Sequence, residues 1–279
     1  MSTTIDEASV EQWSGKDRND ENFPVGVLIR SSLRPHVHAF YAFARNADDI
    51  ADSPTLSPDD KVARLDVMEA ALTEGAPGSP SAARLRASIV ETGMSSRHAV
   101  ELLIAFRRDA TKRRYASWDE LVDYCRYSAM PVGRHVLELH GESTATWPPS
   151  DALCTALQVL NHMQDCTKDL TDLDRCYLPE DMLAAHSASV DDVHLSAETP
   201  GLRATFLDVL ARVEALNETA RGLPRAVRDW RLRLETAVIV NLSQRLARRL
   251  RDGDPLAARV RLQASDAVAS MVASLFSLA

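Results

Sequence analysis

The sequence predicts an all-α protein. Apolar residues recur at helical spacing from Pro35 to the C-terminus, alternating stretches of β-branched residues are nearly absent, and the 279 residues include only 10 glycines. A chain of this length can form one large domain. We expect a loose, polar N-terminal arm over residues 1–21 and a single helical domain over residues 22–279.

Prolines and glycines divide the first half of the chain into predicted helices. The segment from Pro35 to Asp52 has helical apolar spacing, and Pro54 stops it. A second helix is predicted from Pro58 to Thr73, before the turn-rich segment EGAPGSP. Further helices are predicted at residues 81–91, 96–108, 117–129 and 131–140.

A loop at residues 141–151 precedes a long predicted helix that ends near Leu173, with Ser150 or Asp151 as its N-cap. The next segment, 174–201, is predicted to be irregular. Long helices are then predicted at residues 202–220, 225–250 and 259–277. We interpret the last one, which is apolar but short, as a packed helix, with a weak membrane-surface contact as the lesser alternative.

Charge and cysteine use restrict the class of function. A formal net charge of -8 argues against a general nucleic-acid binder, because neutralising phosphates requires a basic face. The four cysteines form no CxxC pair, which indicates reduced thiols. Neither an apolar signal core nor an apolar run of about 18 residues is present. We therefore expect a cytoplasmic protein with at most a transient, peripheral membrane contact; the sequence leaves its oligomeric state open.

Two clusters of aspartates stand more than a hundred residues apart. Asp48, Asp49 and Asp52 form the first, and Asp165 and Asp169 form the second. Residues four apart share one face of a helix, so each cluster presents two carboxylates side by side. Mg²⁺ usually takes one or two carboxylates and completes its shell with water and phosphate oxygens. Aromatic and aliphatic neighbours favour a metal and diphosphate site, with the two clusters facing each other, over solvated surface charge.

The second cluster extends into a polar stripe. Gln158, Asn161, Asp165 and Asp169 lie at offsets of 3, 7 and 11, on one face of an otherwise apolar helix. A buried polar stripe is costly unless each group is paired, and metal and phosphate are suitable partners. The alternative is the exposed face of an amphipathic helix.

These residues also carry a resemblance to a known family. The segment from Tyr41 to Asp52 resembles the first aspartate-rich motif of the squalene/phytoene synthase family. Gln158 to Asp169, followed by Arg175-Cys-Tyr-Leu-Pro179, resembles the second. The stretch from Tyr124 to Gly133 resembles the tyrosine-bearing helix between them. The resemblance covers about residues 22–270 and implies an isoprenoid synthase fold around a central apolar cavity.

Within the family, four segments are similar to the bacterial hydroxysqualene synthases of hopanoid pathways: residues 21–25, Phe43-Ala-Arg45, Arg107-Arg-Asp109 followed by Arg113-Arg-Tyr115, and residues 127–133. This similarity implies a lyase that converts presqualene diphosphate and water to hydroxysqualene and diphosphate, without a reductant. One alternative is a transferase that condenses prenyl diphosphates head to head into presqualene diphosphate, squalene or phytoene. Another is a non-catalytic helical protein that binds a prenyl diphosphate.

The resemblance implies a role for each matching residue. The Mg²⁺ ligands would be Asp48, Asp52, Asn161, Asp165 and Asp169. Substrate contacts would come from Asn22, Tyr41, Arg45 and Gln158, and catalytic contacts from Tyr127, Arg45 and Tyr41. The ring of Tyr127 could stabilise a carbocation and its hydroxyl could position water. The alternatives are a core tyrosine for Tyr127 and, for Arg45, a salt bridge to the neighbouring aspartates.

The chain departs from the family pattern at two informative positions. Gln164 stands where many relatives have Arg, so a positive contact to phosphate would be missing or supplied elsewhere. Asp174 replaces a Gly that often precedes the segment starting at Arg175. The basic run at residues 245–251 is interpreted as a solvated face.

Overall fold

The computed structural model describes residues 9–11 and 28–278, with side chains up to Leu275. It confirms the all-α class: within this part of the chain the regular elements are helices, and one isolated parallel bridge joins Tyr115 to Pro179. The described residues form two compact units, 9–11 with 30–112 and 28–29 with 113–278. Most of the predicted N-terminal arm lies outside the described residues, so the arm and the single domain stay predictions.

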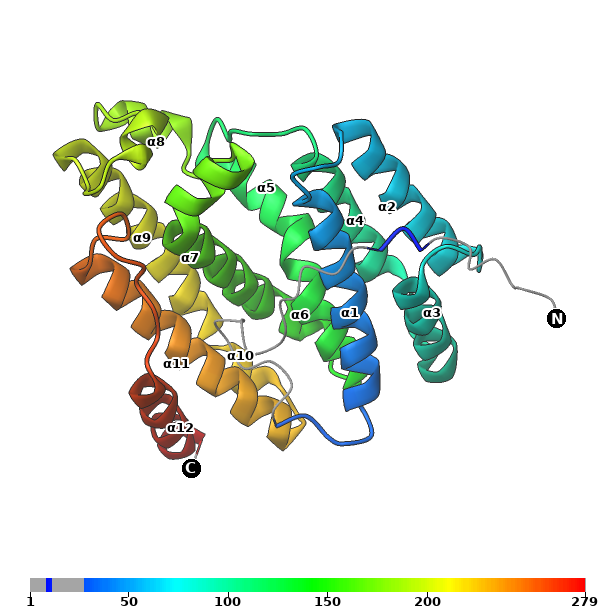
Figure 1. Cartoon of the computed structure of the whole chain (residues 1–279). Coiled ribbons are helices and arrows are strands. Elements are labelled where there is room, and N and C mark those ends of the chain that lie inside the picture. Colours follow the sequence, from blue (N-terminus) through cyan, green and yellow to red (C-terminus); the bar gives the residue numbers. More distant parts are fainter. Residues whose placement is uncertain (1–8, 12–27, 279) are drawn as a thin grey trace. The chain divides into compact units, whose positions relative to one another are not determined.

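The first unit contains four helices with α1 at their centre, drawn in blue to teal in Figure 1. Its elements are α1 (Arg34–Ala51), α2 (Pro58–Thr73), α3 (Pro80–Thr92) and α4 (Arg97–Asp109). The first helix packs against the other three and buries Phe40, Phe43 and Ile50. The predicted helices in this unit are confirmed to within one residue at each end, because prolines and serine caps mark them; Ser57, for example, accepts a hydrogen bond from the Asp60 amide at 3.2 Å.

The second unit is built on the long helix α7, which packs against α5, α6, α9 and α11. Figure 1 shows it in green between α6 and α9. The unit contains α5 (Trp118–Ser128), α6 (Met130–Leu139), η2 (Thr144–Thr146), α7 (Trp147–Leu173), α8 (Glu180–Ala185), η3 (Val190–His194), α9 (Pro200–Ala220), α10 (Leu223–Ala226), α11 (Trp230–Asp252) and α12 (Ala264–Leu278).

The start of α7 differs from the prediction. The helix begins at Trp147, and neither Ser150 nor Asp151 is its N-cap. The following two prolines fit within the first turn, where the missing amide hydrogens would have no helical partner. Ser150 is buried, and Asp151 forms an ion pair with Arg134 at 2.6 Å. Both residues therefore hold α7 to α6.

The predicted helix 225–250 is divided into α10 and α11 by a local hydrogen-bond network. The Glu142 carboxylate accepts hydrogen bonds from the amides of Arg228 (2.9 Å) and Asp229 (2.8 Å), and Asp229 caps α11 by accepting from the Leu232 amide at 3.0 Å. The segment 174–201 contains two short helices that the prediction missed. The predicted helix 259–277 begins later, at Ala264.

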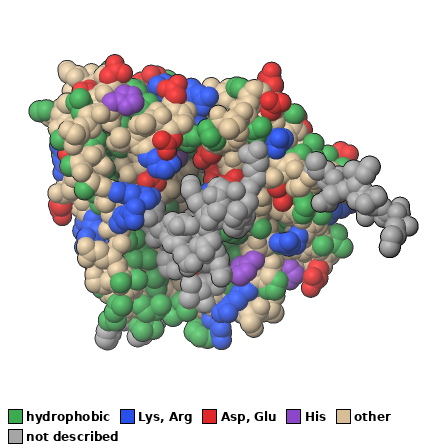
Figure 2. Space-filling view, viewed as in Figure 1, with side chains coloured by type: hydrophobic (Ala, Val, Ile, Leu, Met, Phe, Trp, Pro, Cys, Tyr) green, Lys and Arg blue, Asp and Glu red, His purple; other side chains and the backbone are tan. Residues whose placement is uncertain are grey.

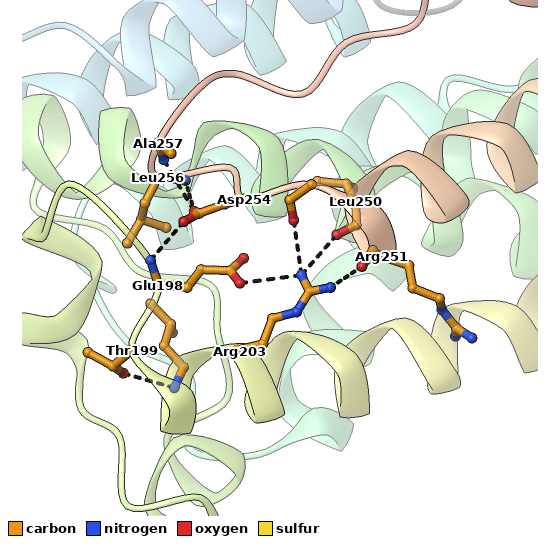
Figure 3. Close-up of polar contacts among 10 residues, drawn as sticks. Glu198, Thr199, Arg203, Leu250, Arg251, Asp254, Leu256 and Ala257 are labelled. Carbon is orange, nitrogen blue, oxygen red and sulfur yellow. Dashed lines mark hydrogen bonds and ion pairs between the residues drawn. The ribbon is translucent and has the colours of Figure 1, made fainter.

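The loop between α11 and α12, residues 253–263, is fixed at its start by a network drawn in Figure 3. Arg203 on α9 donates to the carbonyl oxygens of Leu250, Arg251 and Gly253 at the end of α11, and its guanidinium lies 3.3 Å from the Glu198 carboxylate. Asp254 accepts from the backbone amides of Glu198, Leu256 and Ala257. The network sets the direction in which the loop leaves α11.

The four cysteines are free thiols, as predicted. Burial raises the pKa of Cys154 and of Cys176 to about 11 and that of Cys166 to about 12, so these thiols stay protonated at neutral pH. In the part of the chain that the structure describes, no helix is long and apolar enough to cross a membrane.

Gly133 provides the close approach of α6 to α7. A Cβ atom at this position would lie 2.5 Å from Ser150 Oγ and 2.7 Å from Cys154 Sγ. We expect Gly133→Ala to lower the free energy of unfolding by about 1–3 kcal/mol, because the packed helices must move apart. Urea denaturation measures this. Gly222→Ala is the control, since its Cβ would meet nothing closer than 3.5 Å; equal losses in both variants would contradict the packing argument.

Candidate active site

On α1, Arg45 is held by two aspartates of the first cluster. Its guanidinium nitrogens lie 3.2 Å from a carboxylate oxygen of Asp48 and 3.2 Å from one of Asp49. The Asp49 side chain is only 5% exposed, whereas that of Asp48 is 36% exposed. Tyr41, one turn before Arg45, is half-buried. The salt bridge considered for Arg45 is therefore present, and Asp49 is its buried partner.

The first cluster carries more negative charge than its arginine neutralises. Burial and the neighbouring carboxylate of Asp52 raise the pKa of Asp48 well above its ordinary value, with smaller contributions from Asp49 and Asp109; Arg45 opposes this shift. A bound cation would relieve the repulsion. The donors are carboxylate oxygens, which Mg²⁺ prefers. The residues of α1 therefore fit a magnesium ion.

On α7, the predicted polar stripe is half-buried rather than an exposed face. Gln158, Asn161, Asp165 and Asp169 all have intermediate exposure. His162, which the sequence analysis missed, links two of them. Its Nε2 lies 3.0 Å from Gln158 Nε2, and its Nδ1 lies 3.8 Å from a carboxylate oxygen of Asp169. The stripe therefore includes a titratable ring between an amide and a carboxylate.

Aromatic residues hold this histidine in place. The rings of His162 and Tyr177 stack with centroids 3.5 Å apart and 13° between their planes, and Tyr124 lies 6.0 Å from the same imidazole. Tyr177 belongs to the segment Arg175-Cys-Tyr-Leu-Pro179, which turns back along α7. The motif in the sequence could have indicated that its tyrosine packs on the aspartate helix, but spacing alone did not identify His162 as the contact.

The second aspartate cluster is paired with a residue that the sequence analysis also missed. One terminal nitrogen of Arg259 lies 2.8 and 2.9 Å from the two carboxylate oxygens of Asp165. Gln164 donates to the Val260 carbonyl at 2.6 Å and so holds the loop 253–263 on α7. Burial raises the pKa of Asp165. The neighbouring carboxylate of Asp169 raises it further, whereas Arg259 lowers it. Arg259, on the loop that Gln164 binds, thus brings a positive charge to Asp165.

Asp174 takes the left-handed conformation that explains why relatives often have Gly here. It ends α7 with φ 52° and ψ 36°, a region that Asp tolerates better than most residues. Arg114 donates to its carboxylate at 2.7 Å and lowers the pKa of this group. The ion pair stabilises a turn that glycine would form without strain.

The remaining predicted site residues are distributed as follows. Tyr127 is half-buried on α5, with the guanidinium carbon of Arg126 5.9 Å from its ring centroid. Asn22 lies outside the described residues. The aspartates of α1 and those of α7 belong to different units, so their facing arrangement stays a prediction. Among the described residues, no group of three or more His, Cys, Asp or Glu side chains is arranged to hold a metal ion.

Comparison with known proteins identifies the family. The sequence profile described as "Squalene/phytoene synthase" matches residues 17–266. The chain belongs to the squalene/phytoene synthase family. Hydroxysqualene synthase of Rhodopseudomonas palustris is 48% identical over 91% of this chain and 87% of the relative, and that of Sinorhizobium fredii is 46% identical over 87% and 84%.

Solved structures of squalene/phytoene synthases share this fold. A squalene synthase of Alicyclobacillus acidocaldarius superposes with a TM-score of 0.72 at 34% identity, covering 81% of this chain and 86% of that one. A dehydrosqualene synthase solved with a ligand has a TM-score of 0.79 at 18% identity, covering 90% and 89%, which shows the fold alone. The predicted family and the all-α isoprenoid synthase fold are confirmed.

The different burial of Asp48 and Asp49 leads to a prediction. Without added metal, Asp48→Asn should raise the free energy of unfolding by about 0.5–1 kcal/mol, a modest value because solvent screens a partly exposed charge. Asp49→Asn should lower it by about 2 kcal/mol, because it removes the buried partner of Arg45. Chemical denaturation in the presence of a chelator measures both. The argument fails if the two substitutions shift stability in the same direction.

Proposed function

We propose that this protein is a hydroxysqualene synthase, converting presqualene diphosphate and water to hydroxysqualene and diphosphate. The observation that carries the proposal is the 44–48% identity to three proteins of that name, each over at least 87% of this chain. The aspartate clusters, each paired with an arginine, give the chemistry a structural basis. The chain's substrate would then be a diphosphate with a long apolar portion.

We further propose that the enzyme depends on magnesium. The ligands would be Asp48 and Asp52 on α1 and Asn161, Asp165 and Asp169 on α7. The bound metal would supply charge neutralisation to the departing diphosphate, which lowers the barrier to breaking the carbon–oxygen bond. The raised pKa values of Asp48 and Asp165 support the assignment, because each reflects a partly buried carboxylate with a carboxylate neighbour.

Two arginines would bind the leaving group. Arg45 and Arg259 pair with the carboxylates of Asp48 and Asp165. Each guanidinium would also contact phosphate oxygens of the leaving group, which its planar array of donors suits. Tyr41 and Gln158 would contribute neutral contacts to the diphosphate.

Tyr127 would act at the hydrocarbon end of the substrate. When the bond between the cyclopropylcarbinyl carbon and the diphosphate oxygen breaks, the electron pair leaves with diphosphate and the carbon skeleton becomes a cation. The aromatic face of Tyr127 would stabilise this cation, and its hydroxyl would orient the water that adds to it. Loss of a proton from the added water gives the alcohol, so no hydride donor is needed.

The second candidate is a head-to-head condensing enzyme. The structural relative from Alicyclobacillus acidocaldarius is named a squalene synthase, and phytoene synthases of other organisms are 29–33% identical to this chain. The same metal site would serve condensation of two prenyl diphosphates. The identity of the accepted substrate and the need for NADPH separate the two reactions.

The purified protein should form hydroxysqualene from presqualene diphosphate and Mg²⁺ without NADPH. Mass analysis of the extracted lipid, with farnesyl diphosphate supplied in parallel, identifies the product. Presqualene diphosphate or phytoene-type product from farnesyl diphosphate would move the protein to the condensing class, and strict dependence on NADPH would indicate a squalene synthase.

Substitution of the aspartates tests the magnesium site. Asp48→Ala and Asp165→Ala should each lower kcat by at least about a hundredfold, because the leaving-group charge loses its electrostatic stabilisation. Circular dichroism and the denaturation midpoint should show retained fold. The matched controls are Asp59→Ala on α2 and Asp172→Ala on α7, whose side chains are exposed. Full turnover in either test variant would exclude that aspartate as a ligand.

A further inference from the structure

The C-terminal helix α12 buries its polar face and exposes its apolar face, which is the reverse of a normal packed helix. It contacts α11, and toward the interior it buries Asp266, Ser270 and Ser274, which are at most 6% exposed. Amphipathic helices normally bury their apolar stripe. Two of these polar groups have partners on α11: Asn241 donates to Ser274 Oγ at 3.0 Å, and Arg249 pairs with Asp266 at 2.9 Å.

The apolar stripe of α12 faces solvent instead. Val268, Val272 and Leu275 are 66%, 48% and 54% exposed, and their spacing of four and three residues places them on one face. Figure 2 shows hydrophobic side chains gathered at the lower left, where Figure 1 draws α12. We call these three residues the α12 stripe. Isolated exposed valines and leucines are ordinary, whereas an aligned set on a helix with a buried polar face points to an apolar partner.

Basic groups lie on the segments next to α12. A cavity of about 540 Å³ is lined by Ala273 of α12, by residues of α11, and by Arg221 and Arg225 at the end of α9 and in α10. Arg221 pairs with the exposed Glu218 at 3.1 Å. Arg225 is exposed and has no ion-pair partner among the residues that the structure describes, and the same holds for Arg261, just before α12. Helix α12 therefore has exposed arginines near its start and across the cavity from Ala273, in a chain whose net charge is -8.

We propose that the α12 stripe docks on the surface of an anionic phospholipid bilayer, with Arg225 and Arg261 contacting lipid phosphates. A helix with an apolar face lies in the interfacial plane and inserts that face a few ångströms below the headgroups, and each basic residue near an anionic surface strengthens the attraction. The helix lies on the membrane and does not span it. Arg225 and Arg261 would add electrostatic attraction to the apolar contact of the stripe.

The small size of the α12 stripe favours a bilayer over a second protein. Three partly exposed aliphatic side chains offer far less than the roughly 800 Å² per partner that a stable protein interface usually buries. A bilayer needs no shape complementarity. The purpose of the contact rests on the proposed function, because a substrate with a long hydrocarbon portion, and its uncharged product, partition into membrane rather than water.

Vesicle sedimentation of the full chain tests the docking. Wild type should bind vesicles of equal parts phosphatidylglycerol and phosphatidylcholine more strongly than vesicles of phosphatidylcholine alone. Val268→Asp/Val272→Asp should weaken binding to the anionic vesicles by about tenfold or more, since burial of one valine is worth about a factor of ten. The control is Val90→Asp, which changes an exposed valine on α3.

Charge reversal tests the basic part of the surface. Arg225→Glu should weaken binding to anionic vesicles by about fivefold or more and leave the weaker binding to phosphatidylcholine unchanged. Arg84→Glu, on an exposed position of α3, is the matched control. Variants that bind no worse than their controls would overturn the proposal. A wild-type dimer that becomes a monomer in the double valine variant, without vesicle binding by wild type, would also overturn it and assign the stripe to contact between copies.

Turnover assays separate this proposal from the proposed function. With presqualene diphosphate dispersed in detergent, the double valine variant should match wild type; with substrate in vesicles, its turnover should fall in parallel with its binding. Vesicle binding by a wild type that is inactive on every substrate would leave the docking standing and refute the proposed function. Turnover in detergent without vesicle binding would support the proposed function and refute the docking.

Discussion

Half-buried carboxylates need positive partners, and much of the candidate site follows from that requirement. Asp48 and Asp49 on α1 share Arg45, and Asp165 on α7 is paired with Arg259. Each cluster thus contains an aspartate paired with an arginine, and each contains an aspartate whose pKa is raised by burial. These ion pairs offset part of the electrostatic cost of placing several carboxylates side by side on one helix.

The positions of these charges depend on packing farther from the site. Tyr177 stacks on His162 because the segment after α7 turns back at Asp174, and that turn is held by Arg114. Arg259 reaches Asp165 because Gln164 binds the backbone of the same loop. Polar residues outside the two motifs therefore determine where the motif residues of α7 find their partners.

Local signals predicted the fold well where they were strong. Pro58 and Ser57 fix the start of α2, and the prediction of that helix agrees at both ends. Two boundaries were predicted wrongly. Helix α7 starts before its prolines, a local signal that the prediction misjudged, whereas α11 starts only at Trp230 because Glu142, 87 residues away, accepts a hydrogen bond from the Asp229 amide. Contacts between distant residues leave no periodic signal in a single sequence.

The candidate site was likewise predictable where it depends on local helical geometry. The aspartate spacing identified the carboxylates and the salt bridge of Arg45, since both depend on helical geometry alone. His162 and Arg259 were not predicted, because their contacts are made with the segment after α7 and with a loop distant in sequence. The position of Gln164 suggested a missing charge, but only the structure shows that this side chain holds the loop that brings the arginine.

The loop 253–263 is attached at both ends, by the Asp254 side chain and the Gly253 carbonyl at its start and by the Val260 carbonyl near its end. Arg203 and Asp254 fix its beginning, and Gln164 binds the carbonyl of Val260 near its end. A carbonyl oxygen is present whatever the side chain, so the residue at position 260 can vary, whereas Asp254 and Arg259 act through their side chains. The length of the loop is also constrained: one residue more or fewer between Asp254 and Arg259 would displace the guanidinium from Asp165. Among related chains, the constraint on this loop should therefore appear as a conserved count of residues between these two side chains rather than as conservation of every position.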